Sequence, residues 1–284
     1  MDRRGADMLN FTVNAETCTR CGECALDCPV RIIEQPGEGV PYIKPEEEDD
    51  CMRCQHCLAV CPVGAISILG RNPEQSLPLD PAKLPTLEQM GLLVRGRRTC
   101  RRYLDVNVDP DLLSGILAHL CHAPTGVNRQ ELTFRVIDDK EEMRKIRETT
   151  LTSVLAAREA GTLPEGAAYL HSVAARFYSR KLDILFRGAP HALIISAPAD
   201  APCPEQDVTL ALAYFELMAN SAGLGTVWWG LLKMALGALP ELKPLFGIPD
   251  GHVYYAMLFG VPAFRYQRTT QRDGLSPIVR ITAP

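Results

Sequence analysis

The sequence CTRCGECALDCP, residues 18–29, recurs as CMRCQHCLAVCP at residues 51–62. In both copies three cysteines are spaced three residues apart, a fourth follows four residues later, and a proline comes directly after it. The proline lacks a backbone N–H and turns the chain away from the cysteine that precedes it. Eight of the 11 cysteines therefore form two sets of four.

This spacing is typical of bacterial ferredoxins, which bind two 4Fe–4S clusters, and there the fourth cysteine of each run binds the cluster of the other run. Clusters shared in this way cross-link a domain that is too small to fold on its hydrophobic core alone. We predict that one cluster is bound by Cys18, Cys21, Cys24 and Cys61. We predict that the other is bound by Cys51, Cys54, Cys57 and Cys28.

Zinc sites and disulfides are the alternative interpretations of these cysteines. Zinc ribbons use two Cys-x-x-Cys pairs rather than three evenly spaced cysteines followed by Cys-Pro. Disulfides are disfavoured because the N-terminal residues, MDRRGADMLNFTVN, lack the apolar region of a secretory signal peptide, and we expect a cytoplasmic location. We interpret the three remaining cysteines, Cys100, Cys121 and Cys203, as small apolar residues.

Length and charge limit the classes of function. A chain of 284 residues has room for about two domains. The net charge of −4 gives no reason to expect nucleic acid or an anionic membrane as a partner. No apolar run reaches the roughly 18 residues that a membrane span requires.

A proline-rich stretch, residues 72–86, divides the chain, because such a segment is extended and semi-rigid and shows no hydrophobic period. We therefore predict a two-cluster ferredoxin-type domain at residues 1–71, a linker at 72–90 and a second domain at 91–284. The acidic run at residues 46–50 is interpreted as a solvated surface, and a docking patch for a basic redox partner is the alternative.

Periodicity predicts mixed helices and strands, so the fold class is α+β. Asp109 and Asp207 are predicted helix caps. Predicted strands occupy residues 8–13, 40–44, 66–69, 132–137, 191–196 and 252–260, with a further extended segment at 276–282. Predicted helices occupy residues 86–95, 139–159, 165–187 and 207–222, and another begins at Asp109-Pro110.

Arginine clusters near both ends of the second domain, at residues 97–102 and 265–268, suggest a phosphate-bearing ligand, because a guanidinium grips phosphate through paired hydrogen bonds. A solvated basic surface is the alternative. The glycine patterns of a Rossmann domain and of a P-loop are both missing from the sequence, so an NAD-binding Rossmann domain and an ATPase are unsupported.

Five segments in order resemble the nitroreductase family of flavoproteins. They are RRTCRRY (97–103), APTGVNRQ (123–130), GAPHALIISAP (188–198), GLGTVWWG (223–230) and HVYYAMLFGVPAFRYQR (252–268). With the cysteine runs before them, the whole chain resembles a ferredoxin–nitroreductase fusion. The resemblance implies an α+β domain with a mixed sheet flanked by helices, which binds FMN at the interface of an intertwined homodimer.

The resemblance also implies four groups of FMN-contacting residues. The basic motif at the phosphate and the pyrimidine edge comprises Arg97, Arg98, Thr99 and Arg101. The loop that reaches FMN from the partner subunit comprises Pro124, Thr125, Gly126 and Asn128. The segment along the isoalloxazine comprises Val227, Trp228, Trp229 and Gly230. The C-terminal basic residue at the phosphate is Arg268, and Arg265 is a second candidate. Glu131 replaces a proline that family members often carry, and this change leaves the loop shape open.

These features lead to a functional hypothesis. Electrons enter through the clusters, reduce FMN and leave to a small electrophile such as a nitroaromatic or a quinone. An external ferredoxin or another reductant such as NAD(P)H supplies them, and no dedicated catalytic residue is expected. The alternative is a non-enzymatic electron carrier or redox sensor that serves a protein partner.

Overall fold

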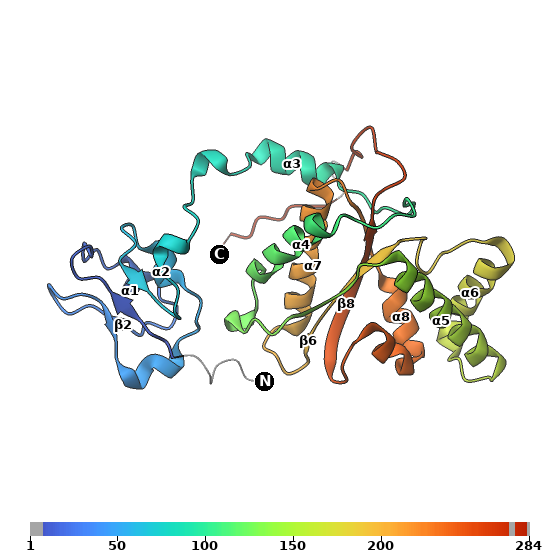
Figure 1. Ribbon diagram of the computed structural model, residues 1–284, viewed down its shortest axis with the longest axis horizontal. Helices are drawn as coiled ribbons and strands as arrows, with labels where there is room; N and C mark the ends of the chain where they lie inside the picture. Colours follow the sequence, from blue (N-terminus) through green and yellow to red (C-terminus); the bar gives the residue numbers. More distant parts are fainter. Residues whose placement is uncertain (1–7, 273–275, 283–284) are drawn as a thin grey trace. The chain divides into compact units, whose positions relative to one another are not determined.

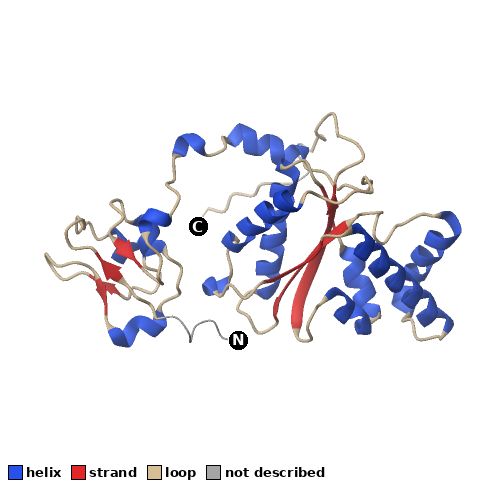
Figure 2. Cartoon of the chain, in the orientation of Figure 1, coloured by secondary structure: helices blue, strands red, loops and turns tan. Residues whose placement is uncertain are grey.

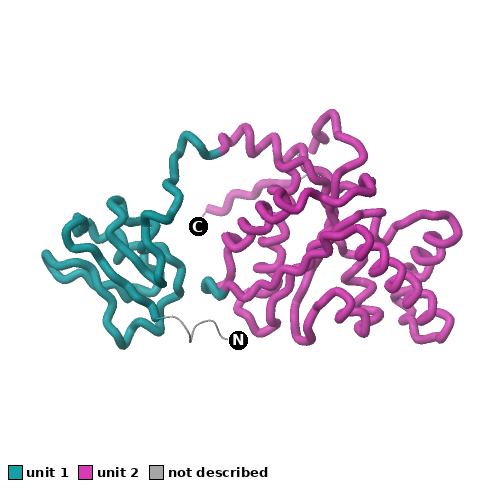
Figure 3. The backbone as a smooth tube through the Cα atoms, viewed as in Figure 1, with its two compact units in different colours: residues 1–84, 127–129 teal, residues 85–126, 130–284 magenta. Residues whose placement is uncertain are grey.

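The computed structural model describes residues 8–272 and 276–282 (Figure 1). The chain forms two compact units, which Figure 3 colours separately. The first unit contains the described residues up to Leu84 together with residues 127–129, and the second contains residues 85–126 and the described residues from 130 onward. Among the described residues, no helix has both the length and the apolar character that a membrane span needs.

Small antiparallel sheets and short helices make up the first unit. One sheet pairs β1 (Thr12–Val13) with β4 (Ile66–Ser67), and the other pairs β2 (Ile33–Glu34) with β3 (Tyr42–Ile43). The helices are α1 (Glu23–Asp27), α2 (His56–Val60) and the 3₁₀ segments η2 (Pro45–Asp50), η3 (Pro73–Gln75) and η4 (Pro81–Lys83). The three strands predicted here are therefore shorter than expected, and β2 was not predicted.

The two cysteine runs adopt the same backbone path. Left-handed φ values recur at equivalent positions, at Arg20, Gly22 and Arg31 in the first run and at Arg53, Gln55 and Gly64 in the second. Such values are sterically unfavourable for residues other than glycine, so their repetition shows that the cysteine loops impose this path. The helices α1 and α2 begin directly after Gly22 and Gln55.

A four-stranded sheet forms the centre of the second unit, in the order β5-β6-β8-β7. Every neighbouring pair of these named strands is antiparallel. Thr99 adds a parallel bridge to Thr226 at the β7 edge, which makes the sheet mixed there. The strands are β5 (Thr133–Ile137), β6 (His191–Pro198), β7 (Gly225–Trp228) and β8 (His252–Gly260).

Helices cover both faces of this sheet (Figures 1 and 2). Alternate residues of β6 enter two separate cores: Ile194 packs with α5, α6 and α8, while Leu193 and Ile195 pack with α4 and α7. This alternation follows from the period of two in a strand. The helices are α3 (Leu87–Gly96), α4 (Pro110–Ala118), α5 (Lys140–Glu159), α6 (Ala168–Arg180), α7 (Pro204–Ser221), α8 (Gly230–Ala238) and the 3₁₀ segments η5 (His119–His122), η6 (Gly126–Asn128), η7 (Glu165–Ala167) and η8 (Pro240–Phe246).

Two predicted helices, 165–187 and 207–222, have boundaries that differ from the structure by several residues. Helix α6 ends at Arg180 rather than at residue 187, because the Asp183 carboxylate accepts hydrogen bonds from the backbone N–H groups of Phe186 and Gly188 and forms a turn there. Helix α7 begins at Pro204, and the predicted cap Asp207 lies inside it, with its carboxylate bonded elsewhere. Residues 276–282 form no regular strand.

Candidate functional site

Each of two cavities in the first unit is lined by four cysteines. One, of about 290 Å³, is lined by Cys18, Cys21, Cys24 and Cys61. The other, of about 350 Å³, is lined by Cys28, Cys51, Cys54 and Cys57. Each set combines three cysteines of one run with the last cysteine of the other, which is the crossed arrangement expected from the spacing. Four thiols are the ligand set of a cubane cluster.

Burial sets the protonation of the thiols in the metal-free protein. It raises the pKa of Cys24 and Cys51, and it raises the pKa of Cys57 to about 12. Neighbouring thiols add to this effect, with Cys21 and Cys61 acting on the pKa of Cys24. Because iron binds the thiolate, these residues must release protons as the clusters assemble.

Backbone N–H groups point at two of the candidate ligand sulfurs. The N–H of Arg53 donates to Sγ of Cys51 at 3.4 Å, and the N–H of Ala65 donates to Sγ of Cys61 at 3.2 Å. Hydrogen bonds to cluster sulfurs are one way in which a protein adjusts the reduction potential. Arg53, which has a left-handed φ, therefore both turns the chain and donates to a candidate ligand sulfur.

A basic cavity of about 700 Å³ lies in the second unit. Arg98 and Arg265, both predicted FMN residues, lie on its wall. The other lining residues are Gly96, Cys100, Asn220, Gly223, Leu224, Gly225, Pro262, Phe264 and Tyr266. Two guanidinium groups and a carboxamide on the wall of one cavity suit a phosphorylated ligand such as FMN.

The neighbouring Arg97 is held by a carboxylate. Its Nη1 lies 3.1 Å from Oε1 of Glu216 on α7. Thr99, two residues further along the chain, forms a β-bridge with Thr226. The Tyr266 hydroxyl donates to the carbonyl oxygen of Thr99 at 3.3 Å. The basic motif is therefore attached both to α7 and to the edge of the sheet.

The loop that begins at Pro124 is attached to the opposite end of α7. The N–H of Gly126 donates to the Asp207 carboxylate at 2.9 Å, and a Cβ at Gly126 would lie 3.0 Å from Sγ of Cys203. The Thr125 hydroxyl accepts from a backbone N–H at 3.0 Å. Asn128 closes η6 with a positive φ. At 1.5 Å per residue, Asp207 and the cavity residue Asn220 lie roughly 20 Å apart along the helix.

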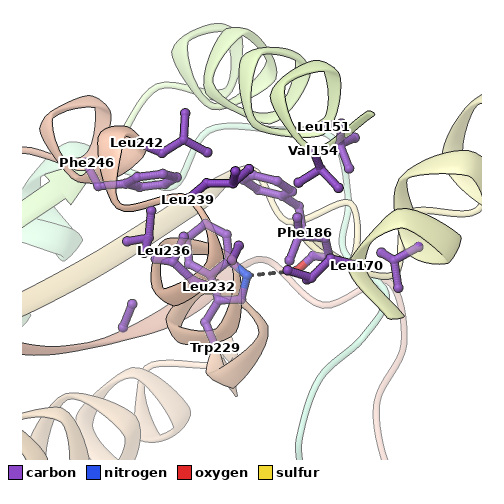
Figure 4. Close-up of a cluster of buried hydrophobic side chains, with 14 of the residues drawn as sticks. Leu151, Val154, Leu170, Phe186, Trp229, Leu232, Leu236, Leu239, Leu242 and Phe246 are labelled. Atoms are coloured by element: carbon purple, nitrogen blue, oxygen red, sulfur yellow. Dashed lines mark hydrogen bonds between the residues drawn. The ribbon is translucent and has the colours of Figure 1, made fainter. Parts of the chain in front are cut away.

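The two adjacent tryptophans have different environments. Trp228 is half-buried, packs on Tyr255 with ring centroids 5.7 Å apart, and donates its indole N–H to Oε2 of Glu216 at 3.1 Å. Trp229 is 2% exposed, contacts Phe186, and donates its indole N–H to the Leu185 carbonyl at 2.8 Å (Figure 4). The Trp229 side chain therefore fills the core, and its contact with a flavin stays a prediction.

Four other residues that were predicted to contact FMN lie outside the lining of the basic cavity. Arg101 and Arg268 are solvent-exposed and do not line the basic cavity. Val227 is half-buried in β7, and Gly230 is placed so that a Cβ there would lie 3.0 Å from the Tyr255 hydroxyl. Arg265, which the resemblance gave only as a second candidate beside Arg268, lies on the cavity wall, and Arg268 does not.

Sequence reasoning missed Glu216 and Asp207 as residues that hold the site together. Glu216 is 7% exposed and Asp207 is 4% exposed, and both lie on the apolar helix α7. Carboxylates are rarely buried without a partner, so an acidic residue within the apolar part of a helix is a sequence signal for a buried polar contact.

Comparison with known proteins identifies the two parts of the chain. Residues 94–261, more than half of the chain, match the family model for the nitroreductase family. The chain belongs to the nitroreductase family. In this nitroreductase an additional segment, residues 17–65, matches the model of a 4Fe-4S dicluster domain.

Relatives agree with this membership. The nitroreductase is 25% identical over 175 residues to a protein of Methanothermobacter thermautotrophicus that carries the provisional name NADH dehydrogenase/NAD(P)H nitroreductase, and the match covers 60% of this chain and 75% of that protein. Solved structures of FMN-bound nitroreductase from Bacteroides fragilis (20% identity, TM-score 0.53) and of FMN-dependent nitroreductase from Clostridium difficile (19% identity, TM-score 0.51) share the fold. The first comparison covers 66% of this chain and 97% of that chain, and the second covers 69% and 100%.

A nitroreductase joined to a 4Fe-4S dicluster domain is an iron–sulfur flavoprotein oxidoreductase. This confirms the predicted α+β fold class, the enzyme class and the expected cofactors, FMN and 4Fe–4S clusters.

Proposed function

We propose that this nitroreductase passes electrons from its two 4Fe–4S clusters to FMN and on to a small electrophilic acceptor, such as a nitroaromatic or a quinone. The observation that carries the proposal is that one chain contains both two four-cysteine cavities and a flavin-type fold with a basic cavity. When bound, the clusters supply one-electron transfer, and FMN supplies the exchange between one and two electrons.

The residues of the first unit would hold the clusters in the crossed arrangement. Burial of Cys24 and Cys57 keeps water away from the thiolates and so limits loss of iron. None of the 11 cysteines, all of which lie in the described residues, forms a disulfide, which suits a reducing compartment such as the cytoplasm.

The residues of the second unit would hold FMN by its charge and by its ring. Arg98 and Arg265, which lie on the wall of the basic cavity, would bind the phosphate. Trp228, half-buried at the end of β7, would contact the ring.

We further propose that the protein works as a homodimer with FMN at the interface. The loop at Thr125 and Gly126 lies roughly 20 Å along α7 from the basic cavity, so a single chain does not bring the two together. A partner subunit could supply the loop to the cavity of the first.

Exposed apolar side chains support this assembly. Helix α3 buries none of its residues, and its Leu92 is 67% exposed. Leu210 and Tyr214, one helical turn apart on α7, are 41% and 40% exposed. Apolar surface of this kind on a helix is typical of a protein–protein interface.

The experiment is an anaerobic titration of the reconstituted full-length protein. We expect reduced ferredoxin to bleach the cluster absorbance before the flavin absorbance, and added nitroaromatic or quinone to restore both. A matched control is the variant C57A/C61A, which removes one ligand from each cavity. It should keep FMN and dithionite-driven turnover but lose turnover with reduced ferredoxin.

If the protein binds clusters and FMN yet reduces no acceptor with either reductant, the enzymatic proposal is refuted. The alternative, a non-enzymatic electron carrier, would then remain. Equal ferredoxin-driven turnover in C57A/C61A would refute the route through the clusters. Sedimentation equilibrium tests the dimer, and a monomer with bound FMN would contradict it.

A further inference from the structure

Glu216 is a buried carboxylate that connects three segments of the second unit. Its Oε1 accepts from Nη1 of Arg97 at 3.1 Å and from the Thr226 hydroxyl at 3.3 Å. Its Oε2 accepts from the indole N–H of Trp228 at 3.1 Å. The basic motif, the edge strand β7 and the helix α7 therefore meet at one side chain.

The charge of this group is balanced inside the protein. The Glu216 side chain is 10% exposed and the Arg97 side chain is 24% exposed, so water screens the pair poorly. Both carboxylate oxygens are satisfied, and a buried carboxylate with one cationic partner is close to electrically neutral. The Arg97 cation is thus committed to Glu216, whereas Arg98 and Arg265 line the basic cavity.

We propose that Glu216 is a positioning residue that holds the Trp228 indole and the Arg97 guanidinium beside the flavin and neutralises the charge of Arg97. This inference rests on the proposed FMN site, because Arg97 and Trp228 belong to the segments assigned to it. The consequence is electrostatic. Reduction places negative charge on the flavin, and a free Arg97 cation would favour the reduced form, whereas the paired cation does so only weakly.

The location of Glu216 distinguishes this role from simple support of the core. A carboxylate that only stabilised α7 could bond to Thr226 and Trp228 alone, since these lie on the strand that packs against the helix. The additional ion pair reaches a residue 119 positions away, at the end of α3 and next to the basic cavity. Its removal therefore changes the charge at the site as well as the stability of the fold.

The experiment measures the affinity of the apoprotein for oxidised and for reduced FMN, together with thermal unfolding. E216Q keeps an amide oxygen that can accept from Trp228 but removes the negative charge. We expect it to shift the ratio of the two affinities about tenfold toward reduced FMN, or about 30 mV in a two-electron potential. R97Q leaves the carboxylate alone and should shift the ratio the other way. The double variant E216Q/R97Q removes both charges and should return the ratio to within about twofold of the wild type.

Glu205 is exposed on the same helix, so E205Q is a matched control. It should change neither the affinity ratio nor the melting temperature. If E216Q fails to fold, the test rests on R97Q and the double variant, which leaves no unpaired charge. These two variants then give the direction of the shift in the affinity ratio. Variants that lower the melting temperature but keep the wild-type ratio would refute the inference and leave Glu216 a structural residue. Failure of the wild type to bind FMN would instead refute the proposed FMN site.

Discussion

The crossed ligation of the two clusters can be tested with two matched double variants. Cys24 and Cys57 occupy equivalent positions in the two runs and are equally buried, at 6% and 7% exposure, so their removal perturbs the core to the same extent. Cys61 lines the same cavity as Cys24 and not the cavity of Cys57. C24A/C61A therefore damages one site twice, whereas C57A/C61A damages both sites once.

The iron content of each variant measures how many clusters it retains. The wild type should carry about eight iron atoms per chain, four in each cluster. We expect C24A/C61A to keep about four iron atoms and C57A/C61A to keep almost none, because a cubane with three of its four ligands is readily lost. The assay is iron and sulfide analysis after anaerobic reconstitution, with electron paramagnetic resonance of the reduced protein to count the clusters.

The uncrossed alternative predicts the opposite result. If each run bound its own cluster, C57A/C61A would keep about four iron atoms and C24A/C61A would lose both clusters. That outcome would refute the crossed ligand sets. C121A removes an exposed cysteine outside both cavities and should keep all of the iron.

Three further predictions concern the second unit. W229F leaves the buried Leu185 carbonyl without its indole donor and opens a small void, and we expect it to lower the free energy of unfolding in urea by about 2 to 3 kcal/mol while FMN affinity changes less than twofold. Burial lowers the pKa of His191, so just below pH 6.5 the unfolded chain binds a proton that the folded chain does not. The free energy of unfolding should therefore be highest above about pH 6.5 and should fall as the pH drops below it. H191Q should flatten this pH dependence in urea titrations. D207A removes the acceptor of the Gly126 N–H and should destabilise the fold by about 1 to 3 kcal/mol and weaken FMN binding severalfold by calorimetry, whereas unchanged FMN affinity would contradict a role of this loop at the flavin.

Local sequence spacing predicts the metal-binding half of the site. Three cysteines at intervals of three residues can wrap one cubane within a single loop, and Cys28 and Cys61 follow each loop at a defined distance. The same holds for the start of α4, where the Asp109 carboxylate accepts from two backbone N–H groups as the Asp-Pro pair predicts. In both cases the interacting groups lie within a few residues of one another.

The sequence alone, then, determined the eight candidate ligands, the α+β class and the order of the family segments, because each is encoded by short-range pattern. Only the tertiary structure decided which tryptophan enters the core: Trp228 and Trp229 are adjacent, so they pack in different cores, and the packing of α8 places Trp229 against Phe186. It also decided that Arg97 pairs with Glu216, since no local pattern links residues separated by 119 positions. Such contacts depend on how α7 and β7 pack together, and that packing is a property of the whole domain.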